Sequence, residues 1–416
     1  MSESWLERAA ALHPERTAVE ASDGARTYRE LLDAAGAVAG ALATRGVRRG
    51  DRVAITLPAG TAFAEALHGC LLAGAAAMPV DPRLAAPEQA ARLRTAAATI
   101  GGPLEPAPPA PVPAAPHPDD SALVVHTSGT TGTPRAVSLS LGNVQASAHG
   151  SAVALGLDRD ERWLCPLPLS HVGGLMVLLR SAIYATTAVL GGPDTPGVTL
   201  ASLVPTQLTR LLDAGTAPPH GLRAVVLGGA PAPRALLERA RDAGWPVAPT
   251  YGLTQACSQV TVGEIGDVET SGRALPGVRV TLAPDGEILV DGPTVAGGGT
   301  LRTGDLGTLD DHGRLRVTGR KTDTIVTGGE NVAPAEVEAV LLAHPAVADA
   351  GVFARPHPEW GEAVTARVVL RGPATPDELR AWAHERLARF KVPKEIELAD
   401  GLPRTASGKL LRGELA

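Results

Sequence analysis

The sequence has few of the features that would tie the protein to a metal, to a disulfide framework or to nucleic acid. Its 416 residues include only three cysteines, Cys70, Cys165 and Cys257, which are far apart and lack any CxxC or metal-ligand spacing. We expect them to be reduced, half-buried apolar residues. No cluster of lysines and arginines occurs, and the formal net charge of -6 argues against a nucleic-acid partner.

From the sequence we also expect neither a leader peptide nor a membrane span. The first residues, Met1 to Trp5, have neither a basic start nor an apolar core. One apolar stretch, Val172 to Leu190, resembles a span in length, but it carries Arg180 at its centre and two glycines near its start. Because a bilayer penalises a central charge, we interpret the stretch as a buried helix. These absences favour a cytoplasmic protein.

The composition that is present suits a globular chain of two or three domains, with 44% hydrophobic and 20% charged residues. Helical spacing alternates with short apolar runs as far as residue 270, which predicts a parallel sheet covered on both faces. Between residues 272 and 317, short strands and turns predict a β-rich subdomain. We therefore predict a large α/β N-terminal domain over residues 1–319 and a small α+β domain over residues 320–416.

A dense cluster of glycines and hydroxyl residues follows the apolar run at residues 122–125. It reads Thr127-Ser128-Gly129-Thr130-Thr131-Gly132-Thr133-Pro134-Arg135. Glycines let the backbone approach an anion, hydroxyls donate hydrogen bonds, and an arginine neutralises charge. The loop is thus typical of polyphosphate binding, although it lacks the Gly-Lys-Ser/Thr of a Walker loop. Taken alone, an ordinary Ser/Thr/Gly turn would be the safer interpretation.

Four further motifs follow the phosphate loop, and the five together resemble the adenylate-forming acyl-CoA synthetase superfamily over nearly the whole chain. The four are Tyr251-Gly252-Leu253-Thr254, Arg302-Thr303-Gly304-Asp305-Leu306, Gly319-Arg320 with Asp323, and Pro403-Arg404-Thr405-Ala406-Ser407-Gly408-Lys409. The resemblance implies that ATP and a carboxylic acid form an acyl-AMP, which then reacts with CoA. It also implies Mg²⁺ as a cofactor, AMP and pyrophosphate as products, and a small C-terminal domain that acts as a mobile lid.

The resemblance also implies roles for individual residues. Lys409, Thr254 and His171 would act in catalysis, with His171 beside the acyl carboxylate and Lys409 between that carboxylate and the α-phosphate. The nucleotide would be bound by Thr127, Ser128, Gly129, Thr130, Thr131, Gly132, Arg135, Gly229, Ala230, Tyr251, Gly252, Thr254, Asp305 and Arg320. CoA would contact Gly328, Gly329, Glu330 and Trp360. For His171, a structural histidine at a helix start is an equal alternative.

Two positions depart from the family pattern. Arg135 stands where lysine is usual, which keeps the positive charge. Gln255 stands where the family has a glutamate that helps to hold Mg²⁺, and a neutral amide is a weaker ligand for a hard cation. Either adenylation is slower in this protein, or the chain is a catalytically weakened nucleotide-binding protein. The intact lysine motif argues against the second alternative.

Within the superfamily, the stretches at residues 168–175, 227–233 and 251–260 look most like those of o-succinylbenzoate-CoA ligases of menaquinone biosynthesis. That substrate has a second carboxylate, and Arg180 could pair with it because the rest of its helix is apolar. A structural arginine is a nearly equal alternative. A generic aryl- or medium-chain acyl-CoA ligase, or an enzyme that loads a carrier protein, would share every nucleotide motif. A homodimer is compatible with the sequence.

Overall fold

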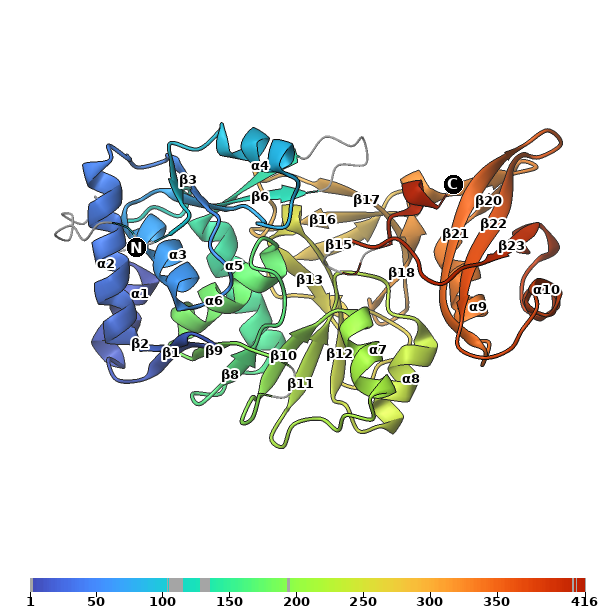
Figure 1. The fold of residues 1–416 in the computed structure, drawn as a ribbon, viewed down its shortest axis with the longest axis horizontal. Coiled ribbons are helices and arrows are strands. Elements are labelled where there is room, and N and C mark those ends of the chain that lie inside the picture. The colour runs from blue at the N-terminus through green and yellow to red at the C-terminus, as the bar shows by residue number, and fades with distance from the viewer. Residues whose placement is uncertain are drawn as a thin grey trace.

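Two sheets rich in parallel strands form the N-terminal body, on the left of Figure 1. The computed structural model describes residues 3–102, 104, 115–127, 135–192, 195–405, 408 and 410–415. The first sheet has the order β14-β13-β12-β11-β10-β8-β9-β1-β2, and the strands from β12 to β1 are parallel. Its strands are β1 (Thr17–Ala21), β2 (Gly24–Thr27), β8 (Arg162–Leu164), β9 (Thr187–Leu190), β10 (Leu200–Leu203), β11 (Ala224–Leu227), β12 (Val247–Leu253), β13 (Ser258–Val262) and β14 (Arg273–Ala274).

The second sheet carries the phosphate loop. Its order is β5-β3-β4-β6-β7, and its strands are β3 (Arg52–Ile55), β4 (Ala76–Pro79), β5 (Ala98–Ile100), β6 (Ser121–Thr127) and β7 (Arg135–Ser140). Strands β6 and β7 are antiparallel, with Thr127 opposite Arg135. Seven of the predicted phosphate-loop residues, Ser128 to Pro134, lie outside the described residues, whereas Thr127 and Arg135 on either side are described.

Eight helices cover these sheets in the described part of the N-terminal body. They are α1 (Trp5–Leu12), α2 (Tyr28–Thr44), α3 (Thr61–Leu72), α4 (Ala86–Leu93), α5 (Leu141–Leu155), α6 (Val172–Tyr184), α7 (Pro205–Asp213) and α8 (Arg234–Asp242). The largest buried cluster joins side chains of α2, α3, α5 and α6 to both sheets. A second cluster packs α7 and α8 against β10, β11 and β12. The sequence therefore folds as the predicted parallel sheets covered by helices.

The apolar stretch from Val172 to Leu190 is not one helix. The buried helix that we predicted there is shorter than the stretch, so the prediction was wrong about where it ends. Helix α6 ends at Tyr184, and Ala185 adopts a left-handed conformation with φ 53°. The amide of Thr186 then donates to the carbonyl of Ser181, and the β-branched Thr187 begins β9. In the portion of the chain with described coordinates, no helix meets the length and apolarity needed to cross a bilayer.

A four-stranded antiparallel sheet and a separate C-terminal sheet complete the molecule (Figure 1). The first holds β15 (Arg279–Leu282), β16 (Glu287–Asp291), β17 (Leu301–Leu309) and β18 (Leu315–Arg320). The second holds β19 (Ile325–Thr327), β20 (Glu330–Val332), β21 (Val347–His357), β22 (Gly361–Leu370) and β23 (Glu395–Leu398), with helices α9 (Pro334–Leu342) and α10 (Pro376–His384). The predicted division at residue 320 stays a prediction, and Arg320 itself is the last residue of β18.

The three cysteines are more deeply buried than the sequence indicated. All are free thiols with exposed fractions of 3% or less. Burial raises the pKa of each thiol to about 12, so none is a nucleophile at neutral pH. They act as small apolar residues of the core.

The hydroxyl of Tyr28 joins the start of α2 to the end of α6, and its removal tests how much this contact stabilises the fold. Its hydroxyl is buried and lies 2.7 Å from the carbonyl oxygen of Ser181 and 2.6 Å from that of Thr186. Tyr28→Phe should lower the free energy of unfolding by about 1–3 kcal/mol, because buried carbonyls lose their donor. Denaturant unfolding measures the loss, and the half-buried Tyr184→Phe serves as the control. Equal stability of Tyr28→Phe and the wild type would contradict this account.

Candidate active site

The first sheet has a point at which its strand order reverses. From β8 the chain passes to β9 on one side, whereas β10, β11 and β12 follow on the other side of β8. In open parallel sheets, ligands bind outside the carboxyl ends of the strands at such a point. His171 follows β8, and Thr206 follows β10 as the second residue of α7. The side chain of Gln207 in α7 connects the segments that follow β8 and β10, since its amide donates to the carbonyl of Pro166 at 3.0 Å.

His171 lies where the two parallel sheets meet. The preceding residue, Ser170, donates to the carboxylate of Asp81 at 3.2 Å, and Asp81 follows β4 of the second sheet. The His171 side chain is exposed, yet the protein around it desolvates the ring and lowers its pKa from 6.5. At neutral pH it is therefore an uncharged imidazole, able to donate or accept a hydrogen bond.

Asp81 is itself closely held. Arg83 donates to both of its carboxylate oxygens, at 2.9 and 2.7 Å, and this ion pair lowers the pKa of Asp81 to about 2. The acid beside His171 is thus fully ionised and already paired. This pairing keeps a free negative charge away from the place where anionic substrates would meet.

Small residues at the ends of β10, β11 and β12 form the predicted adenine slot. A side chain at Gly228 would lie 2.6 Å from Cγ2 of Thr250, so only glycine fits there. Gly229 has φ +80° and lies close to Val204. The structure brings Gly229 and Ala230 to the same edge as Tyr251 and Gly252, as the motifs predict.

Tyr251, Asp305 and Arg320 lie together at the mouth of this slot. The Tyr251 hydroxyl donates to one oxygen of Asp305 at 2.8 Å, and Nε of Arg320 lies 3.3 Å from the other. Asp305 and Arg320 are direct partners across β17 and β18. Tyr251 is only 9% exposed, and burial, together with the charge of Asp305, raises the pKa of its hydroxyl. Tyr251 therefore positions the carboxylate predicted to bind the ribose.

A buried acid fixes the turn that presents Asp305. Glu287 accepts from the amide of Gly304 at 3.1 Å and pairs with Arg302 and Lys321. The hydroxyl of Thr303 also accepts from the amide of Asp305 at 3.1 Å. Gly304 has φ +74°, a conformation that favours glycine. Every residue of the Arg302–Asp305 motif thus contributes to one rigid turn.

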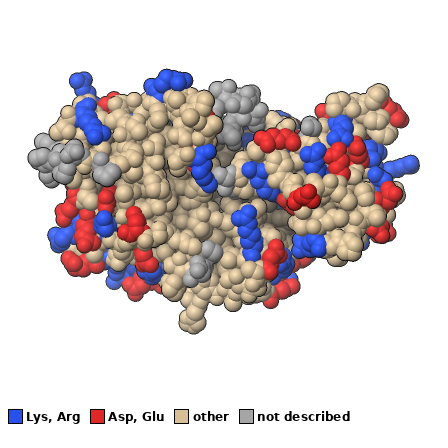
Figure 2. Space-filling view, in the orientation of Figure 1, with Lys and Arg blue, Asp and Glu red and all other residues tan. Residues whose placement is uncertain are grey.

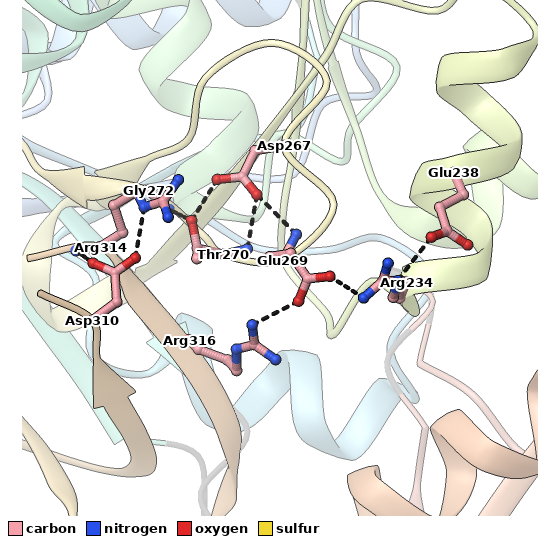
Figure 3. Close-up of polar contacts among 9 residues, drawn as sticks. All are labelled: Arg234, Glu238, Asp267, Glu269, Thr270, Gly272, Asp310, Arg314 and Arg316. Atoms are coloured by element: carbon pink, nitrogen blue, oxygen red, sulfur yellow. Dashed lines mark hydrogen bonds and ion pairs between the residues drawn. The ribbon is translucent and has the colours of Figure 1, made fainter. Parts of the chain in front are cut away.

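Figure 3 shows a second polar network, which joins the start of α8 to β18. Glu269 accepts from Arg234, the first residue of α8 after the slot, and from Arg316 of β18 at 2.6 Å. Asp267 accepts from the amides of Glu269 and Thr270 at 2.8 and 3.0 Å. The segment that carries Glu269 therefore links α8 to β18.

The lysine motif reaches the same edge from the C-terminal domain. A side chain at Gly408 would lie 2.5 Å from the hydroxyl oxygen of Thr206, so the two segments are in contact. Arg404 donates to the carbonyl of Gly408 at 2.7 Å and binds both oxygens of Asp349 in β21. Lys409 lies outside the described residues, and its immediate neighbour is placed beside the carboxyl end of β10. Figure 2 shows basic side chains bordering the hollow centre of this face.

The predicted CoA-binding residues gather elsewhere on the C-terminal domain. Gly328 and Gly329 form the turn between β19 and β20, which ends at Glu330, and the amide of Gly328 donates to the carbonyl of Trp360 at 2.9 Å. The Trp360 ring stacks on His357 with centroids 4.3 Å apart, and Nζ of Lys394 lies 4.5 Å from the Trp360 centroid. A cation beside an aromatic ring can hold the phosphate and the base of a nucleotide. The role of these residues in CoA binding stays a prediction.

Thr254 and Gln255 lie in the short 3₁₀ helix η1 (Thr254–Ala256) that follows β12. The carbonyl of Gln255 accepts from the amide of Ala296 at 2.8 Å, which fixes the backbone and leaves the amide side chain for a ligand. The described residues contain no group of three acidic, histidine or cysteine side chains suited to a metal. Gln255 could therefore supply one neutral oxygen to Mg²⁺, and phosphate oxygens would supply most of the others.

Arg180 is a buried residue of α6, the helix that begins after His171. Arg180 lies near the end of α6, nine residues or about 13 Å along the helix from His171. Its ring neighbour is Trp163 at the start of β8, with 5.5 Å between the guanidinium carbon and the ring centroid. Nη2 of Arg180 donates to the hydroxyl of Ser147 at 3.2 Å, and that hydroxyl donates in turn to the carbonyl of Cys257, the residue that follows η1. The role of Arg180 in substrate binding stays a prediction.

Two family models match most of the chain. A model described as "AMP-binding enzyme" matches residues 6–101 and 98–298, and its C-terminal domain model matches residues 336–409. The chain belongs to the AMP-binding enzymes. Two curated relatives are 2-succinylbenzoate–CoA ligases of Bacillus subtilis strain 168 and Bacillus velezensis, 37% and 36% identical. Each alignment covers 99% of this chain and 97% of the relative.

Solved structures of the family have the same architecture. The o-succinylbenzoate CoA synthetase of B. subtilis in complex with ATP and magnesium ion is similar with a TM-score of 0.91 and 36% identity, covering 99% of this chain and 98% of that one. ATP-bound MatB from Rhodopseudomonas palustris gives a TM-score of 0.90 at 26% identity, with 100% and 98% covered. The predicted family and fold class are therefore confirmed.

Contacts that no motif reveals include Thr206 against Gly408 and Asp81 beside His171. Neither residue has a sequence signal, because each acts through a neighbour that is distant in the chain. Arg404 lies inside the lysine motif, so its hydrogen bond to the carbonyl of Gly408 could have been expected from the sequence. The structure thus adds positioning residues to a site whose ligand contacts the motifs had identified.

Gly408→Ala should slow acyl-AMP formation by at least tenfold, because a side chain at φ +83° would also press on Thr206. Lys409→Ala should show the same pattern, and both variants should still convert supplied acyl-AMP to thioester. Single-turnover measurement of each half-reaction tests this. Gly413→Ala is the control, since nothing lies within 4 Å of a side chain there. Equal loss in both half-reactions would contradict the docking of this loop for adenylation.

Proposed function

We propose that this protein is an ATP-dependent 2-succinylbenzoate–CoA ligase. The observation that carries the proposal is the contact of Gly408 with Thr206, which brings the lysine motif to the edge shared by His171, Thr254 and the Tyr251–Asp305 pair. One site then holds the nucleotide contacts and the catalytic motif of an adenylating enzyme. The substrate follows from the relatives, which are named 2-succinylbenzoate–CoA ligases and align over nearly their whole length.

The chemistry begins with two anions that repel each other, a carboxylate and a triphosphate. In this chain, Lys409 and Arg135 supply positive charge, and Thr254 and the hydroxyls of the phosphate loop supply hydrogen-bond donors. Asp305 and Arg320 hold the ribose, and uncharged His171 contacts the acid. Attack of the carboxylate oxygen on the α-phosphorus forms the acyl-AMP and releases pyrophosphate. Mg²⁺ would neutralise phosphate charge, with Gln255 as a weak ligand.

The second step replaces AMP with the thiol of CoA. The mixed anhydride makes AMP a good leaving group, so the thiolate forms the thioester and the nucleotide departs. The stacked Trp360 ring, Lys394 and the Gly328–Gly329 turn form the surface that supports binding of CoA. Because ATP and CoA are cytoplasmic metabolites, we place the enzyme in the cytoplasm. The proposal leaves the oligomeric state open, and a homodimer stays a prediction.

The purified protein should form 2-succinylbenzoyl-CoA only when ATP, Mg²⁺, CoA and the acid are all present. Chromatography of the nucleotides should give one AMP per thioester. A panel of aryl, medium-chain and malonate-like acids is the specificity control, and a carrier protein can replace CoA in a parallel reaction. Release of ADP would reject the mechanism, whereas faster turnover of a monocarboxylate would reject the substrate.

Gln255→Glu should strengthen Mg²⁺ binding, because a carboxylate is a better ligand than an amide for a hard cation. We expect a gain of about 1–2 kcal/mol, or roughly 5- to 30-fold in adenylation rate at limiting Mg²⁺. Titration of the adenylation rate with Mg²⁺ measures this gain. An unchanged rate and Mg²⁺ dependence would show that position 255 is not a metal ligand.

A further inference from the structure

A partly buried arginine ties the tail that follows the lysine motif to three other elements. Nη2 of Arg412 donates to Glu338 of α9 at 2.8 Å, and Nη1 donates to the same carboxylate. Nη1 also donates to the carbonyl of Val352 in β21 at 2.7 Å. Nε donates to Asp323 at 3.1 Å, the last residue of the short 3₁₀ helix η2 (Lys321–Asp323) that follows β18.

The two carboxylates hold Arg412 in different ways. Glu338 binds both terminal nitrogens of the guanidinium and also accepts from the amide of Val352 at 2.7 Å, so it fixes Arg412 to α9 and β21. This bidentate pair remains if the contact with Asp323 is removed. The pair with Asp323 therefore contributes little to the anchoring of Arg412 itself. Its effect is to fix the tail relative to η2.

The short helix η2 is also tied to the predicted ribose site. It follows Arg320, whose Nε lies 3.3 Å from the carboxylate of Asp305. Nζ of Lys321 lies 3.1 Å from Glu287, the acid that fixes the turn before Asp305. Ion pairs on both sides of η2 therefore connect the ribose carboxylate with Arg412.

The lysine motif is anchored at its first end as well. Arg404 binds both oxygens of Asp349 in β21. Leucines of the tail pack on the same strand where Gly351 leaves room, since an added side chain there would lie 2.8 Å from Leu415 and 3.1 Å from Leu410. The motif is therefore attached to β21 before and after its lysine, and only the contact of Arg412 with η2 ties the tail to the segment beside the ribose pair among the described contacts.

We propose that Arg412 is a positioning residue for adenylation, which sets the place of the lysine motif relative to the bound ribose through its ion pair with Asp323. The inference rests on the ligase function proposed above. In this arrangement the motif reaches the nucleotide edge, where Gly408 contacts Thr206. Arg412 does not touch the reactants and acts through the loop that it holds. Such a role matters because a displacement of about 1 Å can cost roughly a hundredfold in rate.

Asp323→Asn is the decisive variant, because Arg412 keeps its bidentate pair with Glu338. Single-turnover formation of acyl-AMP from ATP and 2-succinylbenzoate should fall roughly tenfold or more. Conversion of supplied acyl-AMP to thioester should stay within about twofold of the wild type, and Tm should change little. Arg412→Lys should show the same split, since an ammonium keeps the charge but lacks the planar fork that binds both carboxylates. Asp377→Asn, which breaks the exposed pair with Arg380 in α10, is the matched control.

Hydrogen exchange provides a readout that needs no acid substrate. ATP should slow exchange of the amides of residues 410–415 in the wild type and in Asp377→Asn, and this slowing should be smaller in Asp323→Asn. An equal rate of adenylation in Asp323→Asn and the wild type, or an equal effect of ATP on exchange, would overturn the proposal. So would parallel losses in both half-reactions with a lower Tm, which a purely structural role produces. Failure of the wild type to form acyl-AMP would instead reject the proposed function, and the exchange rates would then decide this inference.

Discussion

The reversal of strand order at β8 in the first sheet is the constraint on which the rest of the site depends. Parallel strands place all their carboxyl ends at one edge, and the reversal of strand order opens a crevice there. His171, Thr206, Gly229 and Thr254 each follow a different element at this edge. Residues far apart in sequence therefore meet without any unusual backbone geometry. The C-terminal domain needs only to bring one loop to a site that already exists.

Charge balance is the second organising feature. An adenylating site must attract a triphosphate and a carboxylate, so free acidic groups near it would be costly. The acids that are present are matched with cations: Asp81 with Arg83, and Glu287 with Arg302 and Lys321. Asp305 lies between Tyr251 and Arg320, so its charge is held in one geometry. The acids here orient the site and leave the basic side chains to face the substrates.

Sequence motifs were sufficient to predict the family, the fold class and the ligase activity, because phosphate binding and ribose binding need particular residues in a fixed order. Most helices and strands also followed from their periodicity. The stretch from Val172 to Leu190 misled us because a buried helix and a buried strand have the same apolar composition. Arg180 was assigned to the substrate from its apolar neighbours in the sequence, and that assignment stays a prediction. Thr206 and Asp81 could not be predicted, since their partners come together only in the fold.

Isotope exchange between pyrophosphate and ATP tests the central claim most directly, because it reports adenylation without the second step. The claim is that the carboxyl edge of the first sheet joins a carboxylate to AMP before CoA takes part. With ATP, Mg²⁺ and labelled pyrophosphate, 2-succinylbenzoate should drive label into ATP in the complete absence of CoA. Exchange that requires CoA, or that proceeds equally without the acid, would contradict the account.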